Sequence, residues 1–319
     1  MAIARAVATC VCILPAVAQA DAYPTKPIRA LQGFAPGGNA DSIARAVGNE
    51  MSKILGQTVV VEAVTGAGGT LASAAVARAS GDGYTMLLAT AGHAVAGATY
   101  GKLPYDTVKD FAMVSTITYF PFLVVVPADS NLRTFADLLA AARSSTNPLA
   151  YGSAGVGTTH HLAGELLAKM AGVKLLHVPY RGDAASTTAL LAGEIPFTIA
   201  PGTAVEPHIR AGKLRALAVT GPQRWLGMPD VPTVAAQGVS GYDVRSWAGW
   251  MVPRETPPAV VQRLNDATRR ALFSPDVRLR LRQMGGEAQP SSPAEMTQLV
   301  EGEVKKWSQV VTDAGIPKL

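Results

Sequence analysis

Residues 28–55 read IRALQGFAPGGNADSIARAVGNEMSKIL, an apolar run, a glycine-rich turn and an amphipathic stretch in that order. The run at 28–34 is typical of a β-strand, and the stretch at 41–55 is typical of a helix. One face of that helix is apolar and is made by Ile43, Val47, Met51 and Ile54. A strand that enters a helix through a glycine turn is the first half of a βαβ unit, so this stretch favours an α/β fold with a parallel sheet.

The same alternation continues along the chain. The first group is completed by a strand, a helix and a strand, at 58–62, 71–79 and 84–89. A second group begins after Pro127 and has two clear helices, at 134–143 and 158–170, and four strands, at 149–152, 175–178, 195–200 and 214–220. The repetition predicts two Rossmann-like lobes of similar architecture joined by a hinge, rather than one large sheet.

The pattern changes after Pro229. An irregular stretch and a β-rich block, 229–241 and 242–252, precede three helices that begin at or near a proline, 258–273, 275–284 and 293–314. No further strand-rich domain follows, so we expect these helices to pack on the first lobe. The predicted organisation is a signal peptide at 1–20, lobe 1 at 21–122 plus 242–319, and lobe 2 at 123–241. The hinge crossings are expected near 121–127 and 221–245.

Residues 1–20 have the features of a secretory signal peptide. Arg5 precedes an apolar run at 6–17, and Ala18-Gln19-Ala20 forms an A-x-A cleavage site. The run is too short and too interrupted for a membrane anchor, so we expect export with cleavage near Ala20. Both cysteines of the chain, Cys10 and Cys12, lie in this segment. The mature protein is therefore expected to lack disulfides, thiolate metal sites and cysteine nucleophiles.

Composition excludes several classes of protein. The chain is 48% hydrophobic and 16% charged, and no stretch after residue 20 has the length of a membrane span, so no membrane insertion is expected. Lys and Arg are scattered along the sequence without a basic cluster interleaved with aromatics, which argues against nucleic-acid binding. The net charge of +5 suits the attraction of small anions.

The turn at 33–39, Gly-Phe-Ala-Pro-Gly-Gly-Asn, is the strongest local signal. A glycine-rich turn before a helix offers free backbone N–H groups and the positive end of the helix dipole, which together hold an anion. It matches neither the dinucleotide-binding fingerprint nor the phosphate-binding P-loop. An alternative interpretation is a tight turn in which Asn39 caps the helix and Asp41 favours its dipole.

A second turn of this type supports the anion interpretation. Residues 151–160, Tyr-Gly-Ser-Ala-Gly-Val-Gly-Thr-Thr-His, again run from a strand end through glycines into a helix. Ligands of open α/β sheets bind outside the carboxyl ends of the strands. If the two lobes face each other at those ends, both turns meet at one cleft, where a molecule with two carboxylates, or a carboxylate and a carbonyl, would bridge them.

Catalytic and metal-binding interpretations are weaker. Ser153 is not in a nucleophile elbow, and no third group is apparent that would orient a Ser153–His160 pair. The five histidines, at 93, 160, 161, 177 and 208, lack metal-ligand spacing, and the neighbours His160 and His161 point to different helix faces. Thr90 and His93 follow a strand and could reach the cleft, and Arg181 could pair with a carboxylate. The alternatives are a histidine on a loop surface for His93 and a solvated arginine for Arg181.

At this point the residues resemble a known family, the periplasmic solute receptors of tripartite tricarboxylate transporters, also called the Bug family. The resemblance begins with Tyr23-Pro24-Thr25-Lys26-Pro27-Ile28, the glycine turn, Asp41 and Ala44-Arg45. It continues in order through blocks at 66–69, 82–84, 103–106, 109–111, 151–153, 161–165, 177–180, 211–220, 229–233 and 314–316. The resemblance implies a type II periplasmic-binding-protein fold with a cleft between the lobes. It also implies a small carboxylate ligand, held by backbone amides and ordered water.

The family pattern carries over to specific positions. One carboxylate would bind the turn 34–39, the other end would bind Ser153, Gly155, Gly157 and Thr158, and Asp41 would brace the first turn. The full set of predicted ligand-binding residues is Phe34, Ala35, Pro36, Gly37, Gly38, Asn39, Thr90, His93, Ser153, Gly155, Gly157, Thr158, Thr159, His160 and Arg181.

The resemblance also implies what the protein does. We expect a periplasmic, monomeric binding protein that delivers a di- or tricarboxylate or an aromatic carboxylate to two membrane subunits. No cofactor, metal or enzymatic activity is expected, and the alternative is a periplasmic serine hydrolase that uses Ser153.

The chain departs from the family pattern in two places. Ala63-Val64-Thr65 replaces a more polar segment before the glycines at 66, 68 and 69. Ile199 and Ala200 stand where family members often have an Asp or Asn that could meet an ammonium group. Their presence predicts a ligand without an amine.

Overall fold

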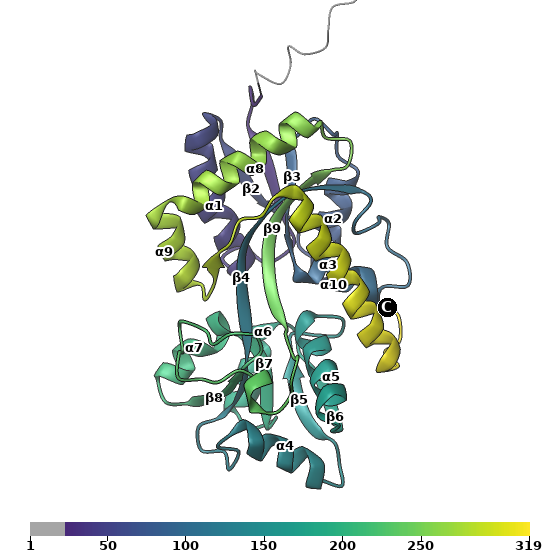
Figure 1. Ribbon diagram of the computed structural model, residues 1–319, viewed down its shortest axis with the longest axis vertical. Coiled ribbons are helices and arrows are strands. Elements are labelled where there is room, and N and C mark those ends of the chain that lie inside the picture. Colours follow the sequence, from purple (N-terminus) through teal and green to yellow (C-terminus); the bar gives the residue numbers. More distant parts are fainter. Residues whose placement is uncertain (1–22) are drawn as a thin grey trace, which may run out of the picture.

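The computed structural model describes residues 23–319, which form two lobes that lie end to end along the longest axis of the molecule (Figure 1). The predicted signal peptide and its cleavage site near Ala20 lie outside the described residues. No helix within 23–319 combines the length and the apolar character that a membrane crossing requires.

Lobe 1 is built on a mixed sheet. Its strands, in spatial order, are β2 (Val59–Ala63), β1 (Ile28–Gln32), β3 (Thr85–Thr90), β9 (Arg245–Pro253) and the first part of β4 (Phe111–Pro127), with the short β10 (Glu287–Ala288) also paired to β4. The first three strands are parallel, as predicted, whereas β9 is antiparallel to both β3 and β4. The sheet is therefore parallel in its βαβ part and antiparallel where its strands connect to lobe 2.

Helices cover both faces of this sheet. One face packs against α1 (Asn39–Leu55), α8 (Pro258–Phe273) and α9 (Pro275–Gln283), and the other against α2 (Thr70–Ala77), α3 (Ala91–Thr99) and α10 (Pro293–Asp313). Strand β3 shows why: Met86 and Leu88 belong to the first core, and Leu87 and Ala89 to the second. Alternate side chains of a strand point to opposite faces, so a continuous apolar run requires cover on both sides.

Lobe 2 repeats this arrangement with its own sheet. The last part of β4 pairs with β7 (Phe197–Pro201) and β8 (Leu214–Val219), and β7 continues into β5 (Leu149–Ser153) and β6 (Leu175–Pro179). The covering helices are α4 (Phe135–Ser144) and α5 (Thr159–Ala171) on one face, and α6 (Asp183–Leu191) and α7 (Gly202–Arg210) on the other. The expected two-lobed α/β fold is confirmed.

Strand β4 belongs to both sheets. Phe111 to Pro121 pair with β9, and from Phe122 onward the partners are β7 and β8. Proline has no amide hydrogen for a strand ladder, and Pro121 stands where the partners change. The sequence-based expectation of a crossing near 121–127 coincides with this switch, although the domain boundaries remain a prediction.

The buried side chain of Thr220 joins the two crossing segments. Its Oγ1 accepts a hydrogen bond from the amide of Phe122 (2.9 Å) and lies 2.7 Å from the carbonyl oxygen of Val244. One hydroxyl thus links the strand that leaves lobe 1 to the segment that returns to it.

Helix α10 contacts both lobes. Its first half, with Met296 and Val300, packs in the core of lobe 1, whereas Trp307, Val310 and Val311 join the core that contains α5. The C-terminal residues continue this contact, because the amide of Leu319 donates to the carbonyl of Thr99 (2.8 Å). Helices α8 and α9 pack entirely on lobe 1.

The strand register shows how the lobes face each other. Thr90, the last residue of β3, pairs with Ala248, which in turn pairs with Thr118 of β4. Pro201, the last residue of β7, pairs with Phe122. Because β3 and β7 approach β4 from opposite ends, their carboxyl ends face each other across residues 118–122, a separation of about 13 Å at the usual strand rise.

Replacing Thr220 by valine tests the link between the crossings. Thr220→Val keeps the shape but leaves the Phe122 amide and the Val244 carbonyl without this partner, which should lower the free energy of unfolding by about 1 to 3 kcal/mol. Urea unfolding would measure it. The matched control is Thr256→Val, because the Thr256 hydroxyl is buried without a hydrogen-bond partner and its loss should cost nothing. Equal effects of the two substitutions would contradict the assignment.

Candidate functional site

Asp41 braces the first glycine turn, as expected. Its buried carboxylate accepts hydrogen bonds from the amide of Gly37 (3.0 Å), from Nε2 of Gln32 (3.3 Å) and from Nε of Arg45 (2.8 Å). The hydrogen bond from Arg45 is the largest influence that lowers the pKa of Asp41 below its ordinary value. Gln32 also accepts from the amide of Phe34 (2.8 Å), so the turn is held from within.

Helix α1 begins without a side-chain cap. Its N-cap is Gly38, and the first intrahelical bond runs from the amide of Ser42 to the Gly38 carbonyl. The amides of Asn39 and Ala40 therefore have no partner within the helix. The alternative in which Asn39 caps this helix is wrong, because Asn39 lies inside it and its Oδ1 is buried without a hydrogen-bond partner.

The second glycine turn is filled by its own hydrogen bonds. The amide of Gly155 donates to Oγ of Ser153 (3.0 Å), and the amide of Gly157 donates to Nδ1 of His161 (3.2 Å). Thr158 caps α5, since its hydroxyl accepts from the His161 amide and donates to the Gly155 carbonyl. The amides of Gly155 and Gly157, predicted to hold the ligand, are instead used to shape the turn, because one N–H makes one strong hydrogen bond.

The stacked rings of His161 and His177 support the second glycine turn. Oγ of Ser153 lies 2.6 Å from Nε2 of His177, and the rings of His177 and His161 stack with centroids 3.9 Å apart. Burial lowers the pKa of His161 to about 4 and that of His177 to about 3. Both rings are therefore neutral at pH 7, and the Gly157 bond fixes the acceptor of His161 at Nδ1.

Ser153 does not have the surroundings of a nucleophile. It is 0% exposed, and its hydroxyl is engaged by His177 and by the turn backbone. His160, considered and judged weak as its catalytic partner, lies elsewhere, with its ring 4.5 Å from that of Phe122 and Nε2 3.2 Å from Oδ1 of Asp183. Ser153 and His160 therefore do not meet. The turn encloses the Ser153 hydroxyl, and its contact with a ligand stays a prediction.

His160 and His161 point to different faces of α5, as predicted. His160 faces Phe122 and Asp183, and burial lowers its pKa against a smaller opposing effect of Asp183. Neither ring nitrogen of His160 forms a hydrogen bond within the described part of the chain. His161 faces His177, on the side of the turn.

Several helices start at the two sheet edges that face each other across residues 118–122, which we call the facing edges; of these, α5 is capped by Thr158. Helices α3, α6 and α7 begin after Thr90, Gly182 and Pro201, at or just beyond the carboxyl ends of strands, and none has a side-chain cap. In contrast, α4 and α10 begin away from these edges, and each has a complete capping box, at Thr134 and Ser292 (Figure 1). The facing edges therefore carry the unpaired amides of several helices, which is an arrangement suited to anions.

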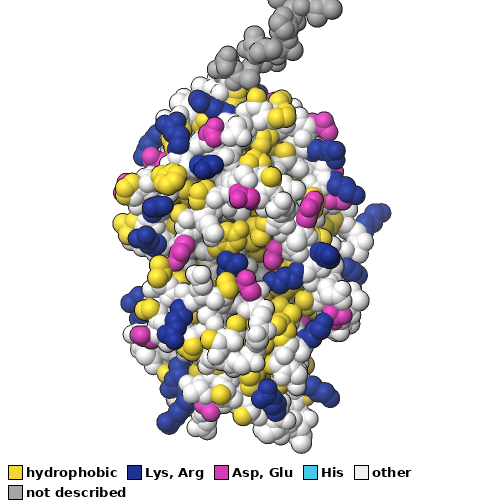
Figure 2. All heavy atoms as spheres, in the orientation of Figure 1, with side chains coloured by type: hydrophobic (Ala, Val, Ile, Leu, Met, Phe, Trp, Pro, Cys, Tyr) yellow, Lys and Arg dark blue, Asp and Glu magenta, His cyan; other side chains and the backbone are white. Residues whose placement is uncertain are grey.

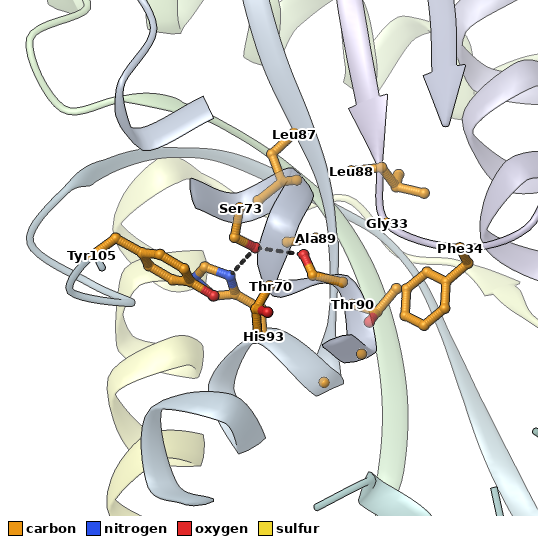
Figure 3. A pocket seen from close by; sticks show the side chains of 13 residues that line it. Gly33, Phe34, Thr70, Ser73, Leu87, Leu88, Ala89, Thr90, His93 and Tyr105 are labelled. Atoms are coloured by element: carbon orange, nitrogen blue, oxygen red, sulfur yellow. Dashed lines mark hydrogen bonds between the residues drawn. The ribbon is translucent and has the colours of Figure 1, made fainter. Parts of the chain in front are cut away.

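His93 is a core residue rather than a cleft residue, which corrects the prediction. It is 5% exposed, with Nδ1 3.0 Å from Oγ of Ser73 and Nε2 2.8 Å from the Thr107 carbonyl, and its ring stacks on Tyr105. Figure 3 shows a cavity with His93 and Tyr105 at one end and Gly33, Phe34 and Thr90 toward the other. The cavity measures about 10 Å³, room for one water molecule, so it does not hold a dicarboxylate.

The other predicted residues have varied surroundings. Phe34 is 37% exposed and its ring packs close to Gly69. A β-carbon added to Gly69 would lie 3.6 Å from this ring. Thr159 is buried, and Arg181 is exposed beyond β6 with no ion pair to any residue from 23 to 319. Ile199 and Ala200 are buried in the two cores of lobe 2, so they do not line the facing edges. A ligand without an amine stays a prediction.

A larger hollow, of about 540 Å³, lies on the side of lobe 1. It is formed by the segment around Tyr105 and by α10 near Val304, with Asp106, Lys109 and Glu301 at its walls. No helix begins among the residues that line this hollow, and its walls carry both acidic and basic side chains. It therefore lacks the free helix amides of the facing edges. Among residues 23–319 no group of three or more potential metal ligands is found.

Comparison with known proteins places the chain in a family. Residues 43–316 match the model of the tripartite tricarboxylate transporter family receptor. The chain belongs to this family. The resemblance noted from the sequence is thereby confirmed.

Solved structures of similar proteins have the same fold. The periplasmic binding protein BugD is 32% identical with a TM-score of 0.81, over 93% of this chain and 100% of that chain. Rpa4515 of R. palustris, solved with adipate, is 35% identical with a TM-score of 0.84, over 93% and 100%. MatC of Rhodopseudomonas palustris, solved with malate, is 33% identical with a TM-score of 0.80, over 91% and 100%.

Sequence reasoning missed the role of His177 and His161. The pairing of β5 with β6 brings His177 close to Ser153, because the parallel register places Tyr151 beside His177 and Ser153 beside Pro179. That register could not be derived before the two strands were known to be neighbours.

The buried histidines should make the fold sensitive to acid. His93 and His161, each 5% exposed, have a pKa of about 4 in the folded protein against an ordinary 6.5, so between these values only the unfolded chain binds their protons. Stability therefore falls as the pH drops from 6.5 to 4, by about 1.4 kcal/mol per pH unit for each histidine. Urea unfolding at pH 7, 6 and 5 measures this slope, and His161→Gln should reduce it. An unchanged slope in that variant would refute the attribution.

Proposed function

We propose that this receptor captures a small dicarboxylate between its two lobes. The observation that carries the proposal is the pair of facing sheet edges, separated by about 13 Å along β4 and lined by helix starts with free first amides. The starts of α1, α3, α6 and α7 have no side-chain cap, and the cap of α5 leaves the amides of Thr159 and His160 free. A molecule with a carboxylate at each end fits such a gap, since each end would meet a separate set of amides. The relatives solved with adipate and with malate support this class of ligand.

The proposed contacts follow from which amides are unpaired. On lobe 1 we assign one carboxylate to the amides of Asn39 and Ala40, with the turn residues Phe34, Ala35 and Pro36 beside it. The amides that start α3, after the N-cap Thr90, add to the same side. Gly37 and Gly38 shape the turn rather than bind, because their amides donate to Asp41 and to the Ala35 carbonyl.

On lobe 2 the contacts differ from those predicted. We assign the second carboxylate to the amides of Thr159 and His160, the first of α5, because those of Gly155, Gly157 and Thr158 are engaged within the turn. Arg181 is the exposed cation nearest in sequence to the start of α6, and it supplies a charge-assisted hydrogen bond when the lobes close.

Closure about β4 completes the site. Contacts from both lobes exist together only when the lobes approach, so ligand binding shifts the population from open to closed. The hinge in this proposal consists of the crossing at 121–122 and the returning segment at 220–244, with lobe boundaries near those expected from the sequence.

The receptor would act in the periplasm as a monomer and pass its ligand to membrane subunits of a tripartite transporter. The family and the signal-like residues 1–20 support this location and this partner. Binding rather than hydrolysis is favoured because Ser153 is enclosed.

Two substitutions at Gly38 distinguish the effect of a helix cap on ligand affinity from the effect of a negative charge. Gly38 has extended backbone angles that Asp or Asn can adopt, and both would cap α1. Gly38→Asp also places a negative charge where the first carboxylate binds, so calorimetry should show dicarboxylate affinity reduced at least tenfold relative to Gly38→Asn. The thermal midpoints of the two variants should agree, because the added β-carbon lies 3.1 Å from the Ala35 carbonyl oxygen in both. Equal affinity in the two variants would exclude an anion site at the start of α1.

Small-angle X-ray scattering tests closure. Saturating amounts of a dicarboxylate that binds in calorimetry should reduce the radius of gyration. Unchanged scattering with bound ligand would count against a closing cleft.

A further inference from the structure

Helices α8 and α9 carry most of the net charge of the protein. Residues 258–283 contain six arginines and two aspartates, a net charge of +4, whereas the whole chain has +5. The arginines are Arg263, Arg269, Arg270, Arg278, Arg280 and Arg282, and all are exposed. We call this surface the arginine face. In the sequence these residues look scattered among apolar positions, and only the packing of the two helices on lobe 1 gathers them.

The arginine face is not neutralised by the protein itself. Elsewhere arginines pair with neighbouring carboxylates, as in Arg29 with Glu62 and Arg210 with Glu206. None of the six arginines forms an ion pair with any residue in 23–319. Arg278 donates to the Leu272 carbonyl at the end of α8, and Arg270, Arg280 and Arg282 lie in last helical turns, where a cation is favourable. Six like charges on two neighbouring helices nevertheless repel one another and leave a net positive surface.

Exposed apolar side chains lie within this surface. Phe273, the last residue of α8, and Leu279, in the middle of α9, are 63% and 56% exposed. The Arg278 guanidinium lies 5.5 Å from the centre of the Phe273 ring. The inner sides of the helices are already satisfied by buried residues such as Leu264 and Leu281. Figure 2 shows Lys and Arg side chains with apolar atoms between them on the part of lobe 1 where Figure 1 draws these helices.

We propose that the arginine face docks on an anionic phospholipid surface. The arginines extend along α8 and α9, which measure about 24 Å and 13 Å, rather than meeting around one point. An extended basic surface with a protruding Phe and Leu matches the interfacial pattern of membrane-surface helices, in which arginines meet lipid phosphates and the apolar tips enter the headgroup layer. An acidic protein surface is the competing partner, and it would more typically require a shaped contact around an anchor residue.

Docking adds to the proposed function without depending on the ligand. Attraction to the membrane plane would keep the receptor close to membrane subunits and restrict its search to two dimensions. The contact is peripheral, in agreement with the absence of a membrane-crossing helix in the described chain.

Vesicle sedimentation of the purified protein tests the proposal. Vesicles of phosphatidylglycerol and phosphatidylcholine should bind it at low salt, vesicles of phosphatidylcholine alone should not, and about 0.5 M salt should release it. Arg280→Gln/Arg282→Gln should weaken binding about 25-fold, at about fivefold for each arginine. Phe273→Ser should weaken it further. Unchanged circular dichroism and thermal midpoints show that these exposed substitutions leave the fold intact.

The matched control is Lys174→Gln/Lys213→Gln, which removes the same charge from exposed positions of lobe 2. This variant should bind the anionic vesicles within about twofold of the unmodified protein. Equal loss in the two double variants would overturn the proposal, as would binding to neutral vesicles or no binding to anionic ones. Binding to neutral vesicles only when they contain an acidic membrane protein would assign the surface to a protein partner instead. None of these outcomes bears on dicarboxylate affinity, which is measured separately.

Discussion

Strand β4 is shared by both sheets, and the geometry of the candidate site depends on this continuity. Because one backbone passes through both lobes, the register of β3 and β7 against it fixes which ends of the other strands face each other. The Thr220 hydroxyl ties the outgoing and returning segments at the point where partners change. In the proposed closing motion, these paired strands would act as the hinge and keep the facing edges aligned.

The two glycine turns show how a binding surface is prepared by internal hydrogen bonds. Asp41 and Ser153 engage amides of their own turns, and His161 engages that of Gly157. The amides left unpaired are the first ones of α1 and α5, whose direction is fixed by the helix axis. Rigid turns around free helix starts favour anion binding because little conformational entropy is lost when the ligand arrives.

Most regular elements were predictable from apolar periodicity, and the predicted 258–273 helix has the bounds observed for α8. Two elements were missed for identifiable reasons. Helix α3 consists mainly of small residues without a polar face, and β4 contains Pro121, which ordinarily argues against a central strand. The proline is tolerated because the ladder changes partners there. The role of His177 also escaped prediction, since it arises from contacts of β6 with β5 and α5.

The sequence by itself determined the α/β class, the two lobes and the two glycine turns before helices, because these follow from local periodicity and from the backbone freedom of glycine. It also contained the six arginines of α8 and α9. Only the tertiary structure decided which amides remain free, that His93 is buried, that Ser153 is enclosed and that the arginines share a surface. The physical reason is that a hydrogen-bond partner and a neighbouring charge are set by packing between segments distant in the chain, which local sequence does not encode.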